Sequence, residues 1–199
     1  MFVVNGMGSR GSLLAPTAAL ELLTLFSEQS QIPSKNTQRT NLTELAQKIV
    51  RRAIKPGDTV IDATAGNGHD TAFLLEAVGE TGTVIAIDIQ PTAIAATRER
   101  LAGSGTKATA IFRNESHDSA LKSLAEAGNK VAAVMFNLGY LPGGDKTITT
   151  GSHSTIVAIQ AALSLLHRGG VLTVVAYRGH AGGREESDAV RQFADGLNS

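Results

Sequence analysis

The 199-residue chain contains no cysteine. Without cysteine it has no disulfide bond, no thiolate zinc site, no cysteine-ligated iron–sulfur cluster and no cysteine nucleophile. Aromatic residues are also scarce, at 4% of the sequence, while hydrophobic residues make up an ordinary 42%. At this length, such a composition is typical of one globular α/β domain with a core of its own.

The chain also lacks a surplus of charge, because 18 Lys and Arg balance 18 Asp and Glu. No global field therefore attracts nucleic acid, and any RNA contact has to come from local basic patches. No apolar run is long enough to span a bilayer, so we expect no membrane partner, and we expect no bound metal. The first acidic residue is Glu21, so an organellar transit peptide stays open beside the cytoplasmic location that we expect.

Residues 60–70 carry the most informative pattern of the chain: an apolar strand, a turn with Gly66 and Gly68, and the start of a helix. A second apolar strand, residues 83–87, runs into Asp88. The glycines let a ligand approach the backbone, the helix start offers N–H groups, and Asp88 can hold a ribose diol. The pattern predicts a site for a nucleoside cofactor.

The glycine spacing indicates which cofactor this is. A dinucleotide fingerprint needs a third glycine, and Thr71 stands in its place. Asp62, ahead of the loop, gives instead the D-x-x-x-G-x-G pattern of class I methyltransferases that use S-adenosylmethionine (SAM). SAM has a cationic sulfonium and no pyrophosphate, which suits an acidic residue behind the loop. Because radical chemistry with SAM needs cysteine, we expect polar methyl transfer; a NAD oxidoreductase and a turn that binds nothing are the alternatives.

Strands and helices are expected to alternate from residue 41 onward. The expected strands are residues 59–63, 83–87, 108–112, 130–136 and 170–176. The expected helices are one that begins at the N-cap Asn41 and those at 69–78, 91–102, 118–127, 153–167 and 185–197. Several strands are apolar throughout, as parallel strands are when both of their faces are buried. The pattern predicts the α/β class, with a Rossmann-like, doubly wound and mostly parallel sheet.

We divide the chain into two parts. Residues 41–199 are expected to form a SAM-dependent methyltransferase domain. Residues 1–40 are expected to be an N-terminal extension, partly helical or disordered, with an irregular glycine-rich start at 1–11 and an amphipathic helix at 13–27.

Ligands of such sheets bind beyond the carboxyl ends of the strands. After the third strand, Ser116 and His117 could hydrogen-bond the nitrogens of an adenine. Ser116 could equally cap the helix that begins near Asp118. The two roles are compatible.

The fourth strand ends in Asn137, Leu138, Gly139 and Tyr140. This run has the ends of the Asn-Pro-Pro-Tyr loop found in SAM enzymes that methylate amino nitrogens, without its prolines. The Asn137 side-chain oxygen and the Leu138 carbonyl can accept the N–H bonds of an amine. Tyr140 can stack on a flipped base. A glycine-rich loop that only closes the strand is the alternative.

The fifth strand leads into a segment with Arg178, His180 and Arg184. His180 could accept a proton or contact a phosphate, although a lone histidine is more often a structural hydrogen-bonding residue. The two arginines could bind phosphates, while pairing with Glu185 or Glu186 is at least as plausible for Arg184.

With these motifs, residues 41–195 resemble the small bacterial methylases known as putative rRNA methylases. The shared segments are residues 62–71, 88–90, 116–118, 135–150 and 179–183. Members of this family are assigned to the wobble uridine of tRNA. They methylate the amino group of 5-aminomethyl-2-thiouridine, giving its 5-methylaminomethyl form. The resemblance implies this activity, SAM as the cofactor and tRNA as the partner.

The resemblance also implies a set of site residues. The SAM contacts would be Asp62, Gly66, Asn67, Gly68, Asp70, Asp88, Gln90, Ser116 and His117. Asp70 would bind the methionine end of SAM or cap its helix. Asn137, Leu138 and Tyr140 would face the target amine. An alkylammonium must first lose its proton, and Asp145 or His180 could accept it.

Two departures from the family matter. The family normally lacks residues 1–40, and it normally continues past the fifth helix into a further strand pair that this sequence does not show. The fifth strand would then be an open edge, which is a liability. The N-terminal extension or a partner chain, as in a homodimer, could cover it. The alternatives for function are methylation of rRNA or of a small-molecule amine, and a SAM-binding module that has lost catalysis.

Overall fold

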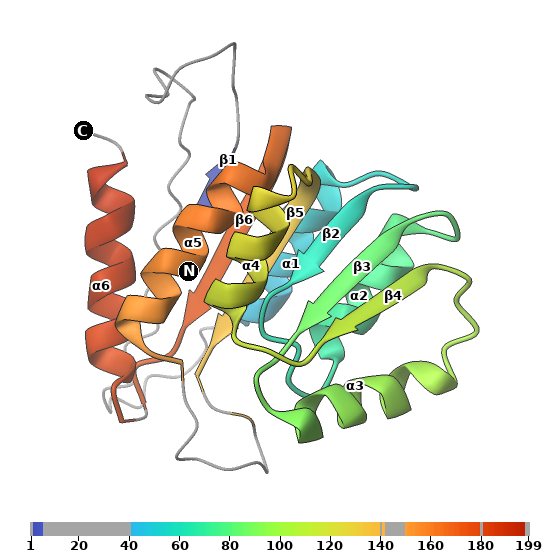
Figure 1. Ribbon diagram of the computed structural model, residues 1–199, viewed down its shortest axis with the longest axis horizontal. Helices are drawn as coiled ribbons and strands as arrows, with labels where there is room; N and C mark the ends of the chain where they lie inside the picture. Colours follow the sequence, from blue (N-terminus) through green and yellow to red (C-terminus); the bar gives the residue numbers. More distant parts are fainter. Residues whose placement is uncertain (1, 6–40, 140, 142–149, 180, 198–199) are drawn as a thin grey trace, which may run out of the picture.

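The computed structural model describes residues 2–5, 41–139, 141, 150–179 and 181–197. Within these residues, one six-stranded sheet has the order β1-β6-β5-β2-β3-β4 (Figure 1). The strands are β1 (Phe2–Asn5), β2 (Thr59–Asp62), β3 (Thr83–Ile87), β4 (Thr109–Arg113), β5 (Val131–Leu138) and β6 (Leu166–Ala176). The helices are α1 (Leu42–Ala53), α2 (His69–Val78), α3 (Pro91–Ala102), α4 (His117–Glu126), α5 (Ser152–Leu165) and α6 (Gly183–Gly196).

The sheet has the doubly wound topology that the alternation of elements predicts. Strands β2 to β6 pair in parallel, and β2 lies between β3 and β5. The strand order therefore reverses direction at β2, and in sheets of this kind ligands bind at the carboxyl ends beside such a reversal. The Rossmann-like α/β class is confirmed, and the place to search for a site lies where β2, β3 and β5 end.

Two apolar cores cover the two faces of the sheet. Ile61, Ile85 and Val134 face one core, which includes residues of α4, α5 and α6. Their neighbours in sequence face the other core, which includes residues of α1 and α2. Figure 1 shows α4 and α5 on one side of the strands and α1 and α2 on the other. Burial of both faces explains why these strands are apolar throughout.

Helix α1 begins where its sequence predicts. The side chain of Asn41 accepts a hydrogen bond from the Thr43 N–H at 3.1 Å and donates to Glu44 at 3.2 Å. Such an N-cap satisfies N–H groups that have no partner inside the helix. The cap fixes the start of α1, which packs on β5 and β6.

The N-terminal residues differ from the prediction. Residues 2–5 are not irregular, because they form β1, which pairs antiparallel with β6 from Phe2 opposite Val174 to Asn5 opposite Val171. The edge of β6 is therefore covered by a segment of the N-terminal extension, which is one of the two arrangements expected for it. The helix expected at residues 13–27 lies outside the described residues.

Strand β5 is longer than predicted at its carboxyl end. It continues to Leu138, so Asn137 lies within the strand, opposite Val175 of β6. A position in a paired strand fixes the backbone of Asn137 more firmly than a position in a loop would.

The described helices include none that is both long and apolar enough to cross a bilayer.

Candidate functional site

The loop between β2 and α2 depends on its two glycines. Gly66 and Gly68 both have positive φ angles, of 54° and 78°. A side chain on Gly68 would also place its Cβ 2.9 Å from the Cα of Thr97 in α3, closer than real Cβ atoms come. The Thr97 hydroxyl in turn donates to the Gly66 carbonyl at 3.2 Å. Gly68 therefore lets the loop pack directly against α3.

Thr71, which stands in the place of that third glycine, has a different function. Its hydroxyl donates to the Asp62 carboxylate at 2.5 Å, and the Thr64 N–H donates to the same carboxylate at 3.2 Å. Asp62 is only 1% exposed, and burial, together with the nearby carboxylate of Asp70, raises its pKa to about 7. Asp62 thus lies behind the loop and supports its backbone. A direct contact with a cofactor stays a prediction.

Asp88 lies at the end of β3 and binds the neighbouring backbone. Its two carboxylate oxygens accept hydrogen bonds from the N–H groups of Gly66 and Gln90, each at 2.9 Å. A carboxylate offers about four acceptor positions, so these bonds leave capacity for further donors. Asp88 is half-buried and remains accessible. The arrangement suits the predicted contact with two ribose hydroxyls.

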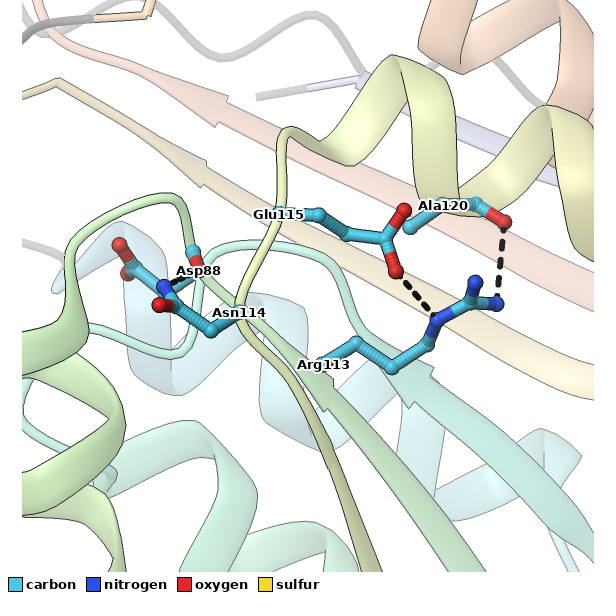
Figure 2. A network of polar contacts seen from close by, with 5 residues as sticks. All are labelled: Asp88, Arg113, Asn114, Glu115 and Ala120. Carbon is cyan, nitrogen blue, oxygen red and sulfur yellow. Dashed lines mark hydrogen bonds and ion pairs between the residues drawn. The ribbon is translucent and has the colours of Figure 1, made fainter.

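Asn114 is a residue of this region that the sequence motifs did not reveal. Its side-chain N–H group donates to the Asp88 carbonyl at 2.9 Å and to the Ile89 carbonyl at 3.0 Å. Figure 2 shows Asn114 beside Asp88, and the neighbouring Arg113 bonded to the Glu115 carboxylate and the Ala120 carbonyl. Asn114 thus joins the end of β4 to the turn after β3. Its place directly after a strand was the available signal.

Asn137 reaches the same region from β5. Its N–H donates to the Thr64 hydroxyl at 2.7 Å, and its side-chain amide donates to the Asp70 carboxylate at 3.4 Å. Asp70 also accepts a hydrogen bond from the side chain of Gln47 in α1, at 2.7 Å. The structure therefore links the predicted acceptor residue Asn137 to the loop after β2, although these residues are far apart in the sequence.

Ser116 and His117, the two residues predicted to contact adenine, have different surroundings. Ser116 is the N-cap of α4 but makes no capping bond with its side chain. The His117 ring packs edge-to-face on Phe136 of β5, with ring centres 5.9 Å apart, and its Nε2 is buried without a partner among the described residues. Burial lowers the pKa of His117. Its ring therefore has a core contact that competes with the predicted contact to adenine.

Gln90 and Asn67 frame the site through their backbones. Gln90 is buried and is the N-cap of α3, and the Asn67 carbonyl accepts a hydrogen bond from Arg100 at 2.5 Å. A hollow of about 380 Å³ on this side of the loop is lined by Asn67, Ala96, Glu99 and Arg100. It contains neither Asp88 nor Asn137. The carboxyl ends of β3 and β5, where those two residues lie, are therefore the better candidate site.

The remaining predicted residues divide into two groups. Leu138 is buried at the end of β5. Tyr140, Asp145 and His180 lie outside the described residues.

Glu186 corrects one expectation about the segment after β6. Its carboxylate is 1% exposed and accepts hydrogen bonds from the hydroxyls of Thr150 and Thr155, at 2.7 and 2.6 Å. It is therefore not the surface partner suggested for Arg184. Arg178, the other arginine of this segment, forms an ion pair with Asp188 at 3.2 Å.

Comparison with protein families adds to this geometry. The profile described as Putative rRNA methylase matches residues 84–199. A second profile, described as Protein-L-isoaspartate(D-aspartate) O-methyltransferase, matches residues 23–118. The second match includes the loop after β2 and ends before Asn137.

One individual relative is similar over most of this chain. A protein of Arabidopsis thaliana named tRNA (mnm(5)s(2)U34)-methyltransferase, chloroplastic, is 43% identical over 167 residues, which are 80% of this chain and 61% of that protein. The chain thus spans about three fifths of the length of that relative.

Two solved structures are similar over most of both chains. One is described as a putative rRNA-methylase from Clostridium thermocellum, with 42% identity, a TM-score of 0.72 and coverage of 80% of this chain and 84% of the other. The other is a putative methyltransferase from Streptococcus mutans in complex with SAH, with 31% identity, a TM-score of 0.68 and coverage of 79% and 83%.

Proposed function

The chain belongs to the Putative rRNA methylase family and has the fold of SAM-dependent methyltransferases, and on this premise we propose that it methylates an amino nitrogen in tRNA. The proposed acceptor is the aminomethyl group of 5-aminomethyl-2-thiouridine at the wobble position, and the product is its 5-methylaminomethyl form. The name of the Arabidopsis relative supports this choice of substrate. The observation that carries the proposal is Asn137, which is bonded both to Thr64 in the loop after β2 and to Asp70.

The residues at the carboxyl ends of β2 and β3 fit SAM. Gly66 has no side chain between a ligand and the backbone, and Asp88 keeps acceptor capacity for a ribose after bonding two N–H groups. The positive end of the α2 dipole lies at the same loop. SAM, when bound there, supplies an electrophilic methyl group.

Asn137 and Leu138 are the acceptor side of the proposed site. The Asn137 side-chain oxygen and the Leu138 carbonyl accept the N–H bonds of the target amine, which directs its lone pair toward the methyl group. A neutral amide is not a base, so Asn137 positions the amine and does not deprotonate it. Asp145 and His180 remain the proposed proton acceptors, and Tyr140 remains the proposed stacking residue for the base.

The experiment uses the full chain, isotope-labelled SAM and total tRNA from cells that lack the last methylation of the wobble uridine. Nucleosides are then separated and identified by mass spectrometry. We expect label in 5-methylaminomethyl-2-thiouridine and its loss, by about 100-fold or more, in Asn137→Ala. A wild-type rate in Asn137→Ala would contradict the role of that residue.

The same experiment separates the rival functions. Ribosomal RNA and small primary amines serve as parallel acceptors. The net charge of zero is the observation that favours a small amine over an extended RNA surface. Label in rRNA alone, or in the small amines alone, would overturn the tRNA proposal. Binding of SAM without transfer to any acceptor would indicate a module that has lost catalysis.

Two further parts of the proposal concern the surroundings of the enzyme. We expect it to act in the cytoplasm, whereas the Arabidopsis relative is named as chloroplastic. We expect tRNA as its partner, with a homodimer as one form of assembly.

A further inference from the structure

Three polar side chains from three elements meet beside the candidate acceptor site. Gln47 comes from α1, Asp70 from the first turn of α2 and Asn137 from β5. The Asp70 carboxylate is 6% exposed and accepts one amide N–H from each neighbour, at 2.7 Å from Gln47 and 3.4 Å from Asn137. The cluster is thus a buried acceptor with a donor on each side.

The backbone of Asn137 is already fixed without this cluster. Its N–H donates to the Thr64 hydroxyl at 2.7 Å, and its place in β5 is opposite Val175. What the backbone leaves open is the rotation of the side-chain amide. Its two orientations have nearly the same shape but exchange an acceptor oxygen for a donor NH₂ group.

A carboxylate removes this ambiguity, because an ionised carboxylate can only accept hydrogen bonds. When the NH₂ group of Asn137 faces Asp70, its oxygen must face the other way. Gln47 uses the second oxygen of Asp70 and so holds the carboxylate in place. Burial and the negative charge of Asp70 raise the pKa of the neighbouring Asp62 to about 7.

We infer that Asp70, held by Gln47, is a positioning residue that selects the amide orientation in which the Asn137 oxygen faces the methyl-accepting amine. The inference rests on the proposed function in one respect, which is that Asn137 meets the amine. It assigns Asp70 to the acceptor side of the reaction, where the sequence motifs had assigned it to SAM.

The test is an exchange of the two side chains. In Asp70→Asn the new amide can either donate or accept, so the orientation of Asn137 is no longer selected. In Asn137→Asp two carboxylates face each other. In the double variant the amide at position 70 donates to the carboxylate at position 137, whose other oxygen can still accept from the amine.

We expect each single variant to lower kcat at least about 10-fold, while the KM for SAM changes less than about 3-fold. We expect the double variant to recover kcat to within about 5-fold of wild type. A double variant no faster than the slower single variant, or a wild-type kcat in Asp70→Asn, would overturn the inference. A purely structural role for Asp70 predicts no such recovery.

Glu186→Gln is the matched control, because it also converts a buried carboxylate to an amide. Glu186 accepts from Thr150 and Thr155 and makes no bond to Asn137 in the described structure. Combining it with Asn137→Asp should therefore give no recovery of kcat. Recovery in this pair would show that a loss of negative charge alone is sufficient, and would overturn the inference.

A second measurement needs no acceptor and covers the case in which Asp70→Asn folds poorly. The side-chain amide signals of Asn137 in an ¹⁵N-labelled full chain are assigned by their loss in Asn137→Asp. We expect them to shift in Asp70→Asn, and to shift less in Gln47→Ala, which keeps the carboxylate. Unchanged signals in both variants would overturn the inference. If the signals shift in the variants as expected but the wild-type chain methylates no tRNA, the proposed function alone is overturned.

Discussion

The two halves of the site are built differently. On the cofactor side, the Gly66 N–H donates to the Asp88 carboxylate, and Gly68 lies so close to α3 that an added Cβ would be 2.9 Å from the Cα of Thr97. On the acceptor side, Asn137 depends on the side chains of Thr64 in the loop after β2 and of Asp70 in α2, which is itself bonded to Gln47 of α1. The bond from Asn137 to Asp70 is 3.4 Å long.

The difference shows how each half tolerates change. A backbone-based site requires particular residues for steric reasons, so a single added methyl group can distort it. A site based on side chains can be reassembled from other donors and acceptors. Substitutions on the cofactor side should therefore change folding and affinity, whereas those on the acceptor side should change rate.

The largest effect is expected for Gly68→Ala. The residue would have to keep a φ of 78° and place its Cβ 2.9 Å from Thr97 Cα. We expect the free energy of unfolding to fall by about 2–4 kcal/mol, from backbone strain and overpacking together. Urea denaturation measures it.

Gly105→Ala is the matched control for this variant. Gly105 has a φ of 63°, but nothing lies within 4 Å of the place its Cβ would take. Only the backbone cost should appear, about 1 kcal/mol. Equal losses in the two variants would show that the contact with Thr97 is unimportant.

A pH-dependent effect of similar size is expected for Asp62→Asn. The pKa of Asp62 is raised from 3.8 to about 7 by burial, so the folded protein keeps a proton that the unfolded chain releases. The stability of the wild type relative to Asp62→Asn should therefore fall as pH rises from about 4 to about 7, by about 2–4 kcal/mol. Denaturation of both proteins across this range measures it, and a constant difference would contradict it.

Asp88→Asn should weaken cofactor binding. One of the two oxygens that accept from Gly66 and Gln90 is replaced by a donor, and the charge is lost. Because hydrogen bonds to charged groups are worth about 1.5–3 kcal/mol, we expect the affinity for SAM to fall about 10- to 100-fold. Calorimetric titration measures it.

Glu115→Gln serves as the control for Asp88→Asn. It lies in the same region (Figure 2) but bonds Arg113 instead of the glycine loop. Its affinity for SAM should stay within about 3-fold of wild type, because the bond that is lost is to Arg113 and not to the glycine loop. A similar loss of SAM affinity in both variants would show that the effect is not specific to Asp88.

The smallest effect is expected at the β1 edge. Neighbouring residues of an antiparallel edge strand point their N–H groups alternately toward and away from the sheet. Of Val3→Pro and Val4→Pro, we therefore expect one to lower the free energy of unfolding by about 1–2 kcal/mol and the other to leave it nearly unchanged. Affinity for SAM should be the same in both. Two unaffected variants would show that β1 does not stabilise the edge of β6.

Much of the fold was predictable from the sequence. Most strands and helices of residues 41–197 occur where the apolar patterns place them, because periodicity and capping are local properties that the chain carries in sequence order. The bounds of β6 were predicted wrongly, since it begins at Leu166, inside the end of the helix expected at 153–167. The strand of residues 2–5 was not predictable, since four residues carry too short a pattern, and their partner β6 is more than a hundred positions away.

The candidate site was predictable to a different degree. The roles predicted for Gly66, Gly68 and Asp88 come from spacing within one strand–turn–helix unit and the next strand. Asn114, Gln47 and Glu186 could not be assigned, because a polar residue on a helix or after a strand has many possible partners. Their hydrogen bonds cross 25, 23 and 36 positions of the chain.

The sequence by itself determined the α/β class, and it predicted the nucleoside-cofactor loop and an amine-binding residue at position 137. The tertiary structure alone decided that Gly68 packs on Thr97, that β1 covers β6, and that Asp70 accepts a hydrogen bond from Asn137. The physical reason is that glycine turns and periodic apolar runs act within a few residues. Which polar groups share a buried space depends on how the elements pack, and no local pattern records that.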